Sequence, residues 1–488
     1  MSTWPEAVDI EDEIIKAIND KQSGNVAVIR ITTTNEDWIG ETVTVSNGYA
    51  VYTATLTRLA PLVTPTGYAA VPVEYIGDYE VEVDETSETV SISALGQIKD
   101  MDIEPYHLYG YKKLKSDSNP YSRVEYTDGA VGFTPLTRNF AEDTTDLGSW
   151  ENTFIINAFR PVMLQSNGHV AYELDHEDQT KKLDGSSSDI SNTTFDGNAM
   201  VGVSTIWLKR WEDEDWEYVQ FSDKKVDSDF KACAHTASDG VTILDEVYLP
   251  MFEGSSVNSK VRSIAGQTPM NNQAGATEKT QIEANGSGWQ FDDHANRELI
   301  RDVLTLLGKS TNGDAVYGAG HNTGGTGAGS LLTTGTKKDK GMFSCSNNND
   351  AVKVLWLENY WGDRWDRCYG AIYDTEGKIK IKMNPPYNTD GAGYDNTGVT
   401  IGGTSGGYIS VTKMTEYGML PVTVSGSETT YEADGCWFNT TQSNFLMRGG
   451  DCRDGAQCGF SCWHVNYLVS SADWAVGPSL SYKQPAAA

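Results

Sequence analysis

Residues 352–365 read VKVLWLENYWGDRW, a run that contains four aromatic side chains and one glycine. Tryptophan and tyrosine at this density fill the space between short strands. Glycine allows the positive φ that a tight turn needs. We therefore expect this segment to be strand-like, with a turn at Gly362, and to belong to a β-rich domain.

The rest of the C-terminal third repeats this mixture of glycine and aromatic residues. The segments that carry the pattern are 402–410, 418–421, 435–438, RGG (448–450), GAQCGF (455–460) and WAVGPSLSY (474–482). The last three of these segments, in this order, resemble the C-terminal frame of C-type-lectin-fold proteins of bacteriophages, and ENYWGDRW (358–365) resembles the matching core segment of the same proteins. That group includes tail-fibre and head-fibre proteins and the receptor-binding proteins diversified by retroelements. The resemblance covers roughly residues 290–483 and implies a C-type-lectin-like α+β binding domain over residues 289–488.

Polar and aromatic side chains lie between the fixed elements of this frame. Most have little reason to be buried, whereas for Trp463 and Tyr467 a place in the core is equally compatible with the sequence. A rigid scaffold that displays such side chains on irregular segments is typical of a binding surface. The resemblance implies that this stretch contacts a ligand. The candidate residues are Asp451, Arg453, Asp454, Gln457, Ser461, Trp463, His464, Asn466, Tyr467 and Asp473.

The first hundred residues show two patterns. Apolar residues at helical spacing predict an amphipathic helix over 5–18, within an N-terminal anchor or cap of residues 1–21. Period-two patterns then predict strands at 26–31, 42–45, 49–52, 79–83 and 90–92, with Asn47–Gly48 as a hairpin turn. This stretch, residues 22–100, resembles an immunoglobulin-like β-sandwich.

Residues 101–288 are expected to form a β-rich middle domain. Strands are predicted at 206–211 and 216–219 around an acidic turn, and long polar loops at 178–197 and 254–288. A helix is predicted to begin at Asp292–Asp293 and to stop at Gly308. The fold class is thus mainly β with some α, in several domains.

Composition excludes several kinds of partner. The net charge is −31, from 68 acidic and 37 basic residues, so nucleic acid and anionic membrane surfaces are poor partners. No apolar stretch is long enough for membrane insertion, and the acidic N-terminus lacks the pattern of a secretory signal. The seven cysteines are not spaced as zinc ligands and are expected to be mostly free thiols. We expect no catalytic residue, no metal and no cofactor.

These observations predict a structural protein of a bacteriophage virion, made in the cytoplasm of the host bacterium. It would act as a tail-fibre or head-fibre adhesin that binds a host cell-surface glycan or protein. Its other partners would be virion proteins and further copies of itself, most plausibly in a homotrimer. The alternatives are an architectural head-decoration or baseplate protein and a glycan-cleaving tail enzyme. Deleting residues 448–483 is expected to distinguish adhesion from architecture.

Formylglycine-generating enzymes, which share the lectin fold, are a further enzyme comparison. They also carry two cysteines after an RGG-like segment, as Cys452 and Cys458 do here. The spacing of the pair differs, however, and the basic, aromatic-rich segment that follows the second cysteine in those enzymes is missing. No activating environment for a thiol is apparent in the sequence.

Overall fold

The computed structural model describes residues 106–346 and 349–485, together with the backbone of six strands between residues 32 and 95. With 35% strand and 12% helix, the chain is mainly β with some α, which confirms the predicted class. It divides into two compact units. The N-terminal unit comprises Met1–Tyr109 and Ser222–Phe230, and the main unit comprises Gly110–Phe221 and Lys231–Ala488.

The described part of the N-terminal unit contains the predicted hairpin and the predicted strands at 79–83 and 90–92. Antiparallel pairing joins β2 to β3 with Ser46 opposite Val51, so the connection is longer than Asn47–Gly48 alone. Strands β5 and β6 pair antiparallel over seven residues each. The sheet order is β3-β2-β6-β5, and β1 pairs with β4. The predicted helix over 5–18 and strand over 26–31 lie outside the described residues. The strands are β1 (Thr32–Thr33), β2 (Thr42–Ser46), β3 (Val51–Thr55), β4 (Thr57–Arg58), β5 (Asp78–Asp84) and β6 (Thr89–Leu95).

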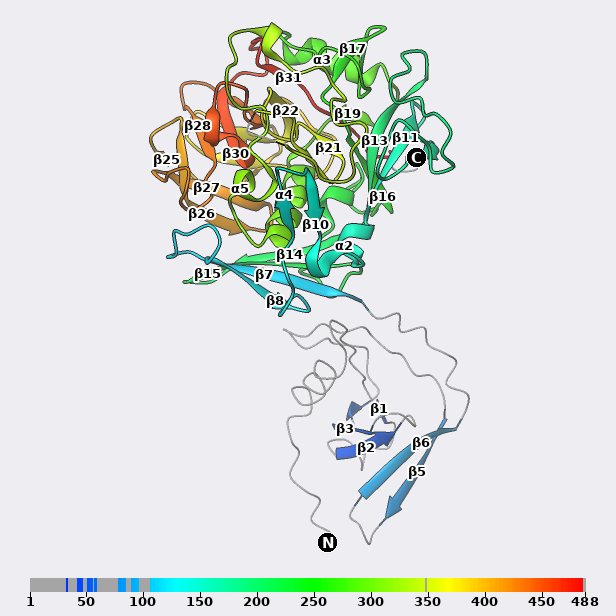
Figure 1. Cartoon of the computed structure of the whole chain (residues 1–488). Helices are drawn as coiled ribbons and strands as arrows, with labels where there is room; N and C mark the ends of the chain where they lie inside the picture. Colours follow the sequence, from blue (N-terminus) through cyan, green and yellow to red (C-terminus); the bar gives the residue numbers. More distant parts are fainter. Residues whose placement is uncertain are drawn as a thin grey trace. The chain divides into compact units, whose positions relative to one another are not determined.

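The largest sheet of the main unit belongs to the last third of the chain (Figure 1). Its order is β24-β23-β22-β29-β30-β28-β26-β27-β25, and β31 runs parallel to β22. Apolar residues of β22, β29 and β30 form much of its core. The strands are β22 (Trp365–Tyr373), β23 (Ile379–Ile381), β24 (Asp395–Asn396), β25 (Gly402–Gly403), β26 (Gly407–Thr415), β27 (Gly418–Val424), β28 (Gly435–Phe438), β29 (Asn444–Gly449), β30 (Gly459–Tyr467) and β31 (Val476–Pro478).

A six-stranded sheet joins the predicted middle and C-terminal domains into one unit. Its order is β12-β11-β13-β16-β32-β19, so the last strand of the chain lies between two strands from before residue 292. Tyr482 of β32 pairs with Tyr248 on one side and Trp289 on the other. The predicted domain boundary between residues 288 and 289 is therefore wrong, because the two segments share one sheet. The strands are β11 (Phe159–Gln165), β12 (Val170–Glu173), β13 (Gly197–Ser204), β16 (Glu246–Pro250), β19 (Trp289–Phe291) and β32 (Leu480–Tyr482).

A four-stranded sheet of order β14-β15-β7-β8 contains the predicted tryptophan hairpin. Trp211 and Tyr218 stack across it with ring centroids 4.7 Å apart, and the amide of Asp213 donates to the carbonyl of Trp216 at the turn. This hairpin is confirmed. Its strands are β7 (Leu108–Leu114), β8 (Val124–Asp128), β14 (Trp207–Glu212) and β15 (Trp216–Ser222), and the small two-stranded pairs are β9 (Thr137–Asn139) with β10 (Thr144–Asp146), β17 (Ser255–Val257) with β18 (Lys260–Arg262), and β20 (Lys353–Val354) with β21 (Leu357–Glu358).

The predicted helix is confirmed as α4 (His294–Gly308), which packs against β22, β27 and β30. The carboxylate of Asp293 caps it by accepting the amide of Asn296, and Lys309 takes the left-handed conformation directly after Gly308. All fifteen residues of α4 are buried, charged ones included. The other helices are α2 (Phe154–Asn157), α3 (Gly275–Glu283) and α5 (Gly313–Tyr317), with 3-10 turns η2 (Gly148–Trp150), η3 (Cys233–His235), η4 (Ala328–Ser330) and η5 (Gly455–Gln457).

Two local predictions need correction. The stretch 254–288 is not one long loop, because it contains the hairpin β17–β18 and the helix α3. The run 352–365 is not a single strand either: β20 and β21 form a hairpin whose two turn residues, Leu355 and Trp356, have positive φ. All fourteen residues of this run are buried, as a core segment should be. In the described part of the chain, no helix has the length and apolar character needed to cross a membrane.

Candidate binding face

The ten candidate residues lie on the loop between β29 and η5, on η5, on β30 and on the segment that leads to β31. Four of them, Asp451, Ser461, Trp463 and His464, are buried. The expectation of exposure is therefore wrong for Asp451, Ser461 and His464, whereas Trp463 takes the core position that the sequence left open. Arg453 is exposed, and Asp454, Gln457, Asn466, Tyr467 and Asp473 are half-buried.

The burial follows from the position of β30 inside the sheet. This strand pairs with β29 on one side and β28 on the other, so it is a central strand. Trp463 packs under α4, with its ring 5.3 Å from that of His294 and the guanidinium of Arg448 5.0 Å above it. On the opposite face, the ring of His464 lies 4.8 Å from that of Trp365. Both faces of β30 are covered, and neither Trp463 nor His464 reaches the surface.

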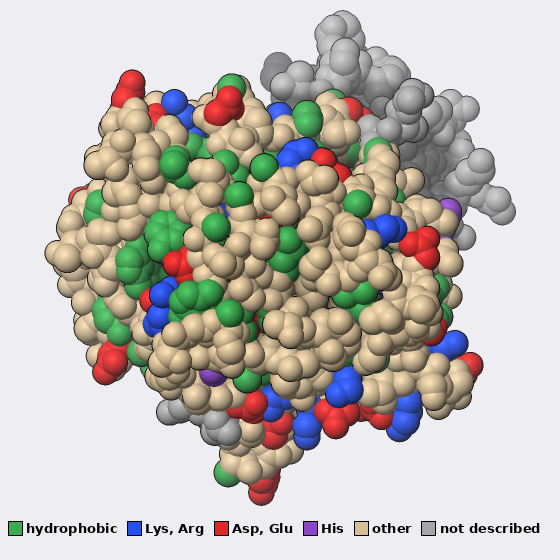
Figure 2. Space-filling model, turned by 90° about the horizontal axis from the view of Figure 1, so that it is seen from above, with side chains coloured by type: hydrophobic (Ala, Val, Ile, Leu, Met, Phe, Trp, Pro, Cys, Tyr) green, Lys and Arg blue, Asp and Glu red, His purple; other side chains and the backbone are tan. Residues whose placement is uncertain are grey.

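A second group of side chains gathers where β28, η5 and the segment before β31 meet. We call Trp437, Arg453, Tyr467, Asp473 and Trp474 the aromatic face. Each of these residues is half-buried or exposed. In Figure 2, hydrophobic side chains gather toward the left of the view, on the side of β28, with acidic and basic side chains beside them.

Buried aromatic rings support the aromatic face from below. Trp437 stacks on His464 with centroids 6.1 Å apart, and Trp365 meets Trp437 edge-on at 5.2 Å. Tyr467 meets the other side of His464 at 4.8 Å. Burial lowers the pKa of His464 to about 3, so the imidazole is neutral. The half-exposed rings therefore rest on a fixed, uncharged base.

Arg453 supplies the positive charge of the face. Its Nη2 lies 2.6 Å from Oδ2 of Asp451 and 3.8 Å from Oδ1 of Asp473. Its guanidinium also lies 4.7 Å from the centre of the Trp474 ring. The hydrogen bonds to Asp451 raise the pKa of Arg453 above its ordinary value, so the charge is permanent. Arg453 is thus held in place although 42% of its side chain is exposed.

Asp454 is next to Arg453 in the chain, and the pKa of its carboxyl group is unusual. Burial and the neighbouring charge of Asp451 raise the pKa of Asp454 to about 7. Its Oδ2 accepts the amide of Asp451 at 2.9 Å, which fixes the turn. The charge of the loop that carries Arg453 therefore changes near neutral pH.

Gln457 and Asn466 have internal partners. The amide of Gln457 donates to the carbonyl of Gly406 at 2.6 Å. Asn466 accepts from the side chain of Asn439 through its backbone carbonyl, at 3.0 Å, and through its side-chain oxygen. These two residues tie neighbouring loops together, and we leave them out of the aromatic face. Sequence reasoning missed Trp437 and Trp474, which it treated as parts of the glycine–tryptophan frame.

The cysteines do not form a reactive group. All seven are free, which confirms the prediction of free thiols. Burial raises the pKa of Cys452 to about 12 and that of Cys458 well above its ordinary value. A thiol that keeps its proton is a poor nucleophile, which disfavours the comparison with formylglycine-generating enzymes. Among residues 106–346 and 349–485, no group of three His, Cys, Asp or Glu side chains is placed to hold a metal.

The chemistry of the aromatic face is that of non-covalent recognition. Flat rings stack on sugar or peptide groups, and a guanidinium and a carboxylate bind hydroxyls, carbonyls or carboxylates. Comparison with known proteins adds no assignment: neither the protein-family models nor the curated proteins match this sequence.

Proposed function

We propose that the chain is a surface protein of a bacteriophage particle that binds a host cell-surface molecule through its aromatic face. In this proposal the N-terminal unit contains the immunoglobulin-like module, residues 22–100, that connects to the particle, and the main unit contains the lectin-like module, residues 289–488. Several copies on each particle, arranged as trimers, would multiply a modest affinity. No chemical step is part of the proposal.

One observation carries the proposal. Arg453 is held by two carboxylates and stacked against Trp474, yet 42% of its side chain is exposed. Arginine and tryptophan dominate the binding energy of protein interfaces when they are rigidly presented. A fixed arginine beside half-exposed rings loses little conformational entropy when a ligand binds.

An architectural role is the second candidate. The burial of Asp451, Ser461, Trp463 and His464 favours it, because these side chains serve packing instead of recognition. In that case the aromatic face would contact another virion protein, and the particle would lose this chain when the face is altered.

The deletion of residues 448–483 cannot separate the two functions. It would remove β30, β31 and β32, and β32 is the strand that lies between β16 and β19. Point substitutions are the better test. Particles that carry Arg453→Ala and Trp474→Ala should contain the normal amount of this protein and should adsorb to host cells poorly. The control Tyr121→Ala removes an exposed aromatic ring elsewhere in the main unit and should adsorb normally.

Three outcomes distinguish the candidates. Normal incorporation with reduced adsorption supports receptor binding. Reduced incorporation supports the architectural role and contradicts the proposal. Normal incorporation together with normal adsorption contradicts a function for the face in either sense.

A further inference from the structure

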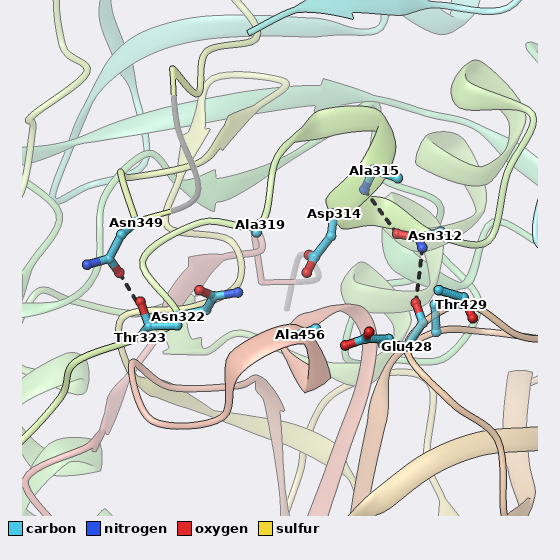
Figure 3. A pocket seen from close by; sticks show the side chains of 11 residues that line it. Asn312, Asp314, Ala315, Ala319, Asn322, Thr323, Asn349, Glu428, Thr429 and Ala456 are labelled. Carbon is cyan, nitrogen blue, oxygen red and sulfur yellow. Dashed lines mark hydrogen bonds between the residues drawn. The ribbon is translucent and has the colours of Figure 1, made fainter.

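A cavity of about 610 Å³ opens beside α5 (Figure 3), and none of its lining residues belongs to the aromatic face. Its wall is formed by α5 and the residues around it, by Asn322–Thr323, by the loop at Glu428–Thr429 and by Ala456 of η5. Four alanines, among them Ala319 and Ala456, leave room in it. The volume falls in the range of small-molecule sites in proteins.

Three polar side chains point toward the middle of this cavity: Asp314, Asn322 and Glu428 (Figure 3). Asn322 is only 4% exposed, and its side-chain amide makes no hydrogen bond to any described residue. Oδ1 of Asp314 is out of contact with solvent and has no hydrogen-bond partner in the described part of the chain. Buried polar groups are normally paired, so the amide of Asn322 marks a place where a ligand can supply a missing partner, whereas Oδ1 of Asp314 lies out of its reach.

The three side chains that point into the cavity determine which kind of ligand it can hold. Two carboxylates and an amide oxygen accept hydrogen bonds, and only the amide nitrogen of Asn322 donates. No lysine or arginine is found among the described residues that line the cavity, so its walls carry no compensating positive charge. Burial raises the pKa of Asp314 well above its ordinary value, and a nearby cation would reverse this shift. The cavity is thus suited to a positively charged, hydrogen-bond-donating molecule.

The neighbouring side chain of Asn312 is already occupied, which helps to orient the site. Its oxygen accepts the amide of Ala315 at 3.0 Å, and its nitrogen donates to the carbonyl of Glu428 at 3.3 Å. These two bonds connect the start of α5 to the loop that carries Glu428. The backbone at Glu428 is therefore tied to the start of α5, the helix that carries Asp314.

We propose that this cavity is a binding site for a sugar that carries a free amino group, with the ammonium between Asp314 and Glu428 and a hydroxyl on Asn322. A bare divalent cation is a poorer fit, because calcium needs six to eight oxygen ligands in a much smaller space. The site is independent of the proposed function, since it shares no side chain with the aromatic face.

Isothermal titration of the full chain with glucosamine tests the proposal. A ligand with about twelve non-hydrogen atoms is expected to bind with a Kd on the order of 1 mM. Glucose lacks the amine and N-acetylglucosamine lacks its charge, so both should bind at least about 10-fold more weakly, the range of one charge-assisted hydrogen bond. Added salt should weaken the binding of glucosamine.

Variants locate the binding. Asp314→Asn and Glu428→Gln should each weaken glucosamine binding by about 10-fold or more. Glu428 is exposed, so the second variant tests the site even where the first changes the fold. Glu376→Gln removes another exposed carboxylate of the main unit and should leave binding unchanged.

Several results would overturn the proposal. One is equal affinity for glucose and glucosamine, which would remove the role of charge. Another is glucosamine binding that is unchanged in both Asp314→Asn and Glu428→Gln. A third is that the wild type does not bind glucosamine at concentrations up to about 100 mM, roughly two orders of magnitude above the expected Kd. Calcium alone, bound by the wild type and lost in Asp314→Asn, would identify an ion site instead. Particle adsorption plays no part in this test, so its failure would leave the aromatic face unaffected.

Discussion

Glu298 on α4 is the strongest single test of how the main unit is held together. Its Oε1 accepts from Arg448 at 2.9 Å, and its Oε2 accepts from Arg301 and from the amide of Met419, each at 2.9 Å. Glu298, Arg301 and Arg448 are at most 1% exposed. Burial alone would raise the pKa of Glu298, but Arg301 and Arg448 hold it well below its ordinary value. The carboxylate thus balances two buried guanidiniums, and its ion pair with Arg448 joins α4 to β29.

Glu298→Gln keeps the shape of the side chain and removes the charge. Removing one partner of a buried ion pair leaves an uncompensated charge and costs about 3–5 kcal/mol. We expect the free energy of unfolding of the full chain to fall by about this amount at pH 7. Because the depressed pKa of Glu298 stabilises the fold only above its unfolded pKa of about 4.5, the deficit should shrink as the pH falls below this value.

Urea unfolding followed by tryptophan fluorescence measures this loss. The exposed Glu151→Gln is the matched control and should change stability by less than about 0.5 kcal/mol. The double variant Glu298→Gln/Arg448→Met should be less destabilised than the sum of the two single variants, because each removes what the other leaves unpaired. A loss below about 1 kcal/mol for Glu298→Gln, the range of a surface ion pair, would refute this account of α4.

Three further predictions concern burial and titration. His464 has a pKa near 6.5 in the unfolded chain and near 3 in the folded chain, so the wild type loses stability as the pH falls below 6.5. The destabilisation by His464→Gln, measured by urea unfolding, should therefore be smaller by about 2 kcal/mol at pH 5 than at pH 7. An equal destabilisation at the two pH values would contradict the burial of His464. Asp454 has a raised pKa in the folded chain, so its carboxyl group lowers the stability of the fold as the pH rises from about 4 to 7. Asp454→Asn should therefore raise the melting temperature above that of the wild type, and by more at pH 8 than at pH 5. A larger increase at pH 5 would show that the pKa of Asp454 is not raised. A methyl group on Gly477 would overlap Arg364. Gly477→Ala should therefore lower the free energy of unfolding, measured with urea, by at least about 4 kcal/mol. The control Gly327→Ala adds a methyl group in open space and should change this free energy little.

The local patterns of the sequence predicted individual elements well. Alternation identified the hairpins β2–β3, β5–β6 and β14–β15, and the apolar stripe with a capping aspartate identified α4. Each of these signals lies within a short window, where side-chain periodicity reflects the backbone directly. Helix α3 was missed because its apolar residues do not recur at helical spacing. It is held by contacts from elsewhere, such as the ion pair between Glu278 and Arg367.

The long-range arrangement could not be read in this way. Polar residues on β30 suggested exposure, yet α4 covers one face of this central strand and the rings of Trp365 and Trp437 cover the other. Ser461, for example, donates its backbone amide to the buried Asp434. The insertion of β32 between β16 and β19 joins segments more than 180 residues apart. No local sequence pattern predicts such a strand pairing, because the register is set by strands that are distant in the chain.

The aromatic face was predicted only in part. Arg453, Tyr467 and Asp473 belong to the expected set, whereas Trp437 and Trp474 were assigned to the scaffold. Tryptophan serves both purposes, and only its neighbours decide between them. Trp437 rests on His464, and Trp474 lies under Arg453.

Binding of the purified full chain to host cells tests the central claim most directly. Fluorescently labelled wild-type chain should bind host cells saturably, and Trp474→Ala should weaken this binding by about 30-fold or more, the effect of losing one interface hot spot. Tyr121→Ala should bind as the wild type does. Equal binding of wild type and Trp474→Ala, with both folded by circular dichroism, would contradict the claim that the aromatic face recognises the cell.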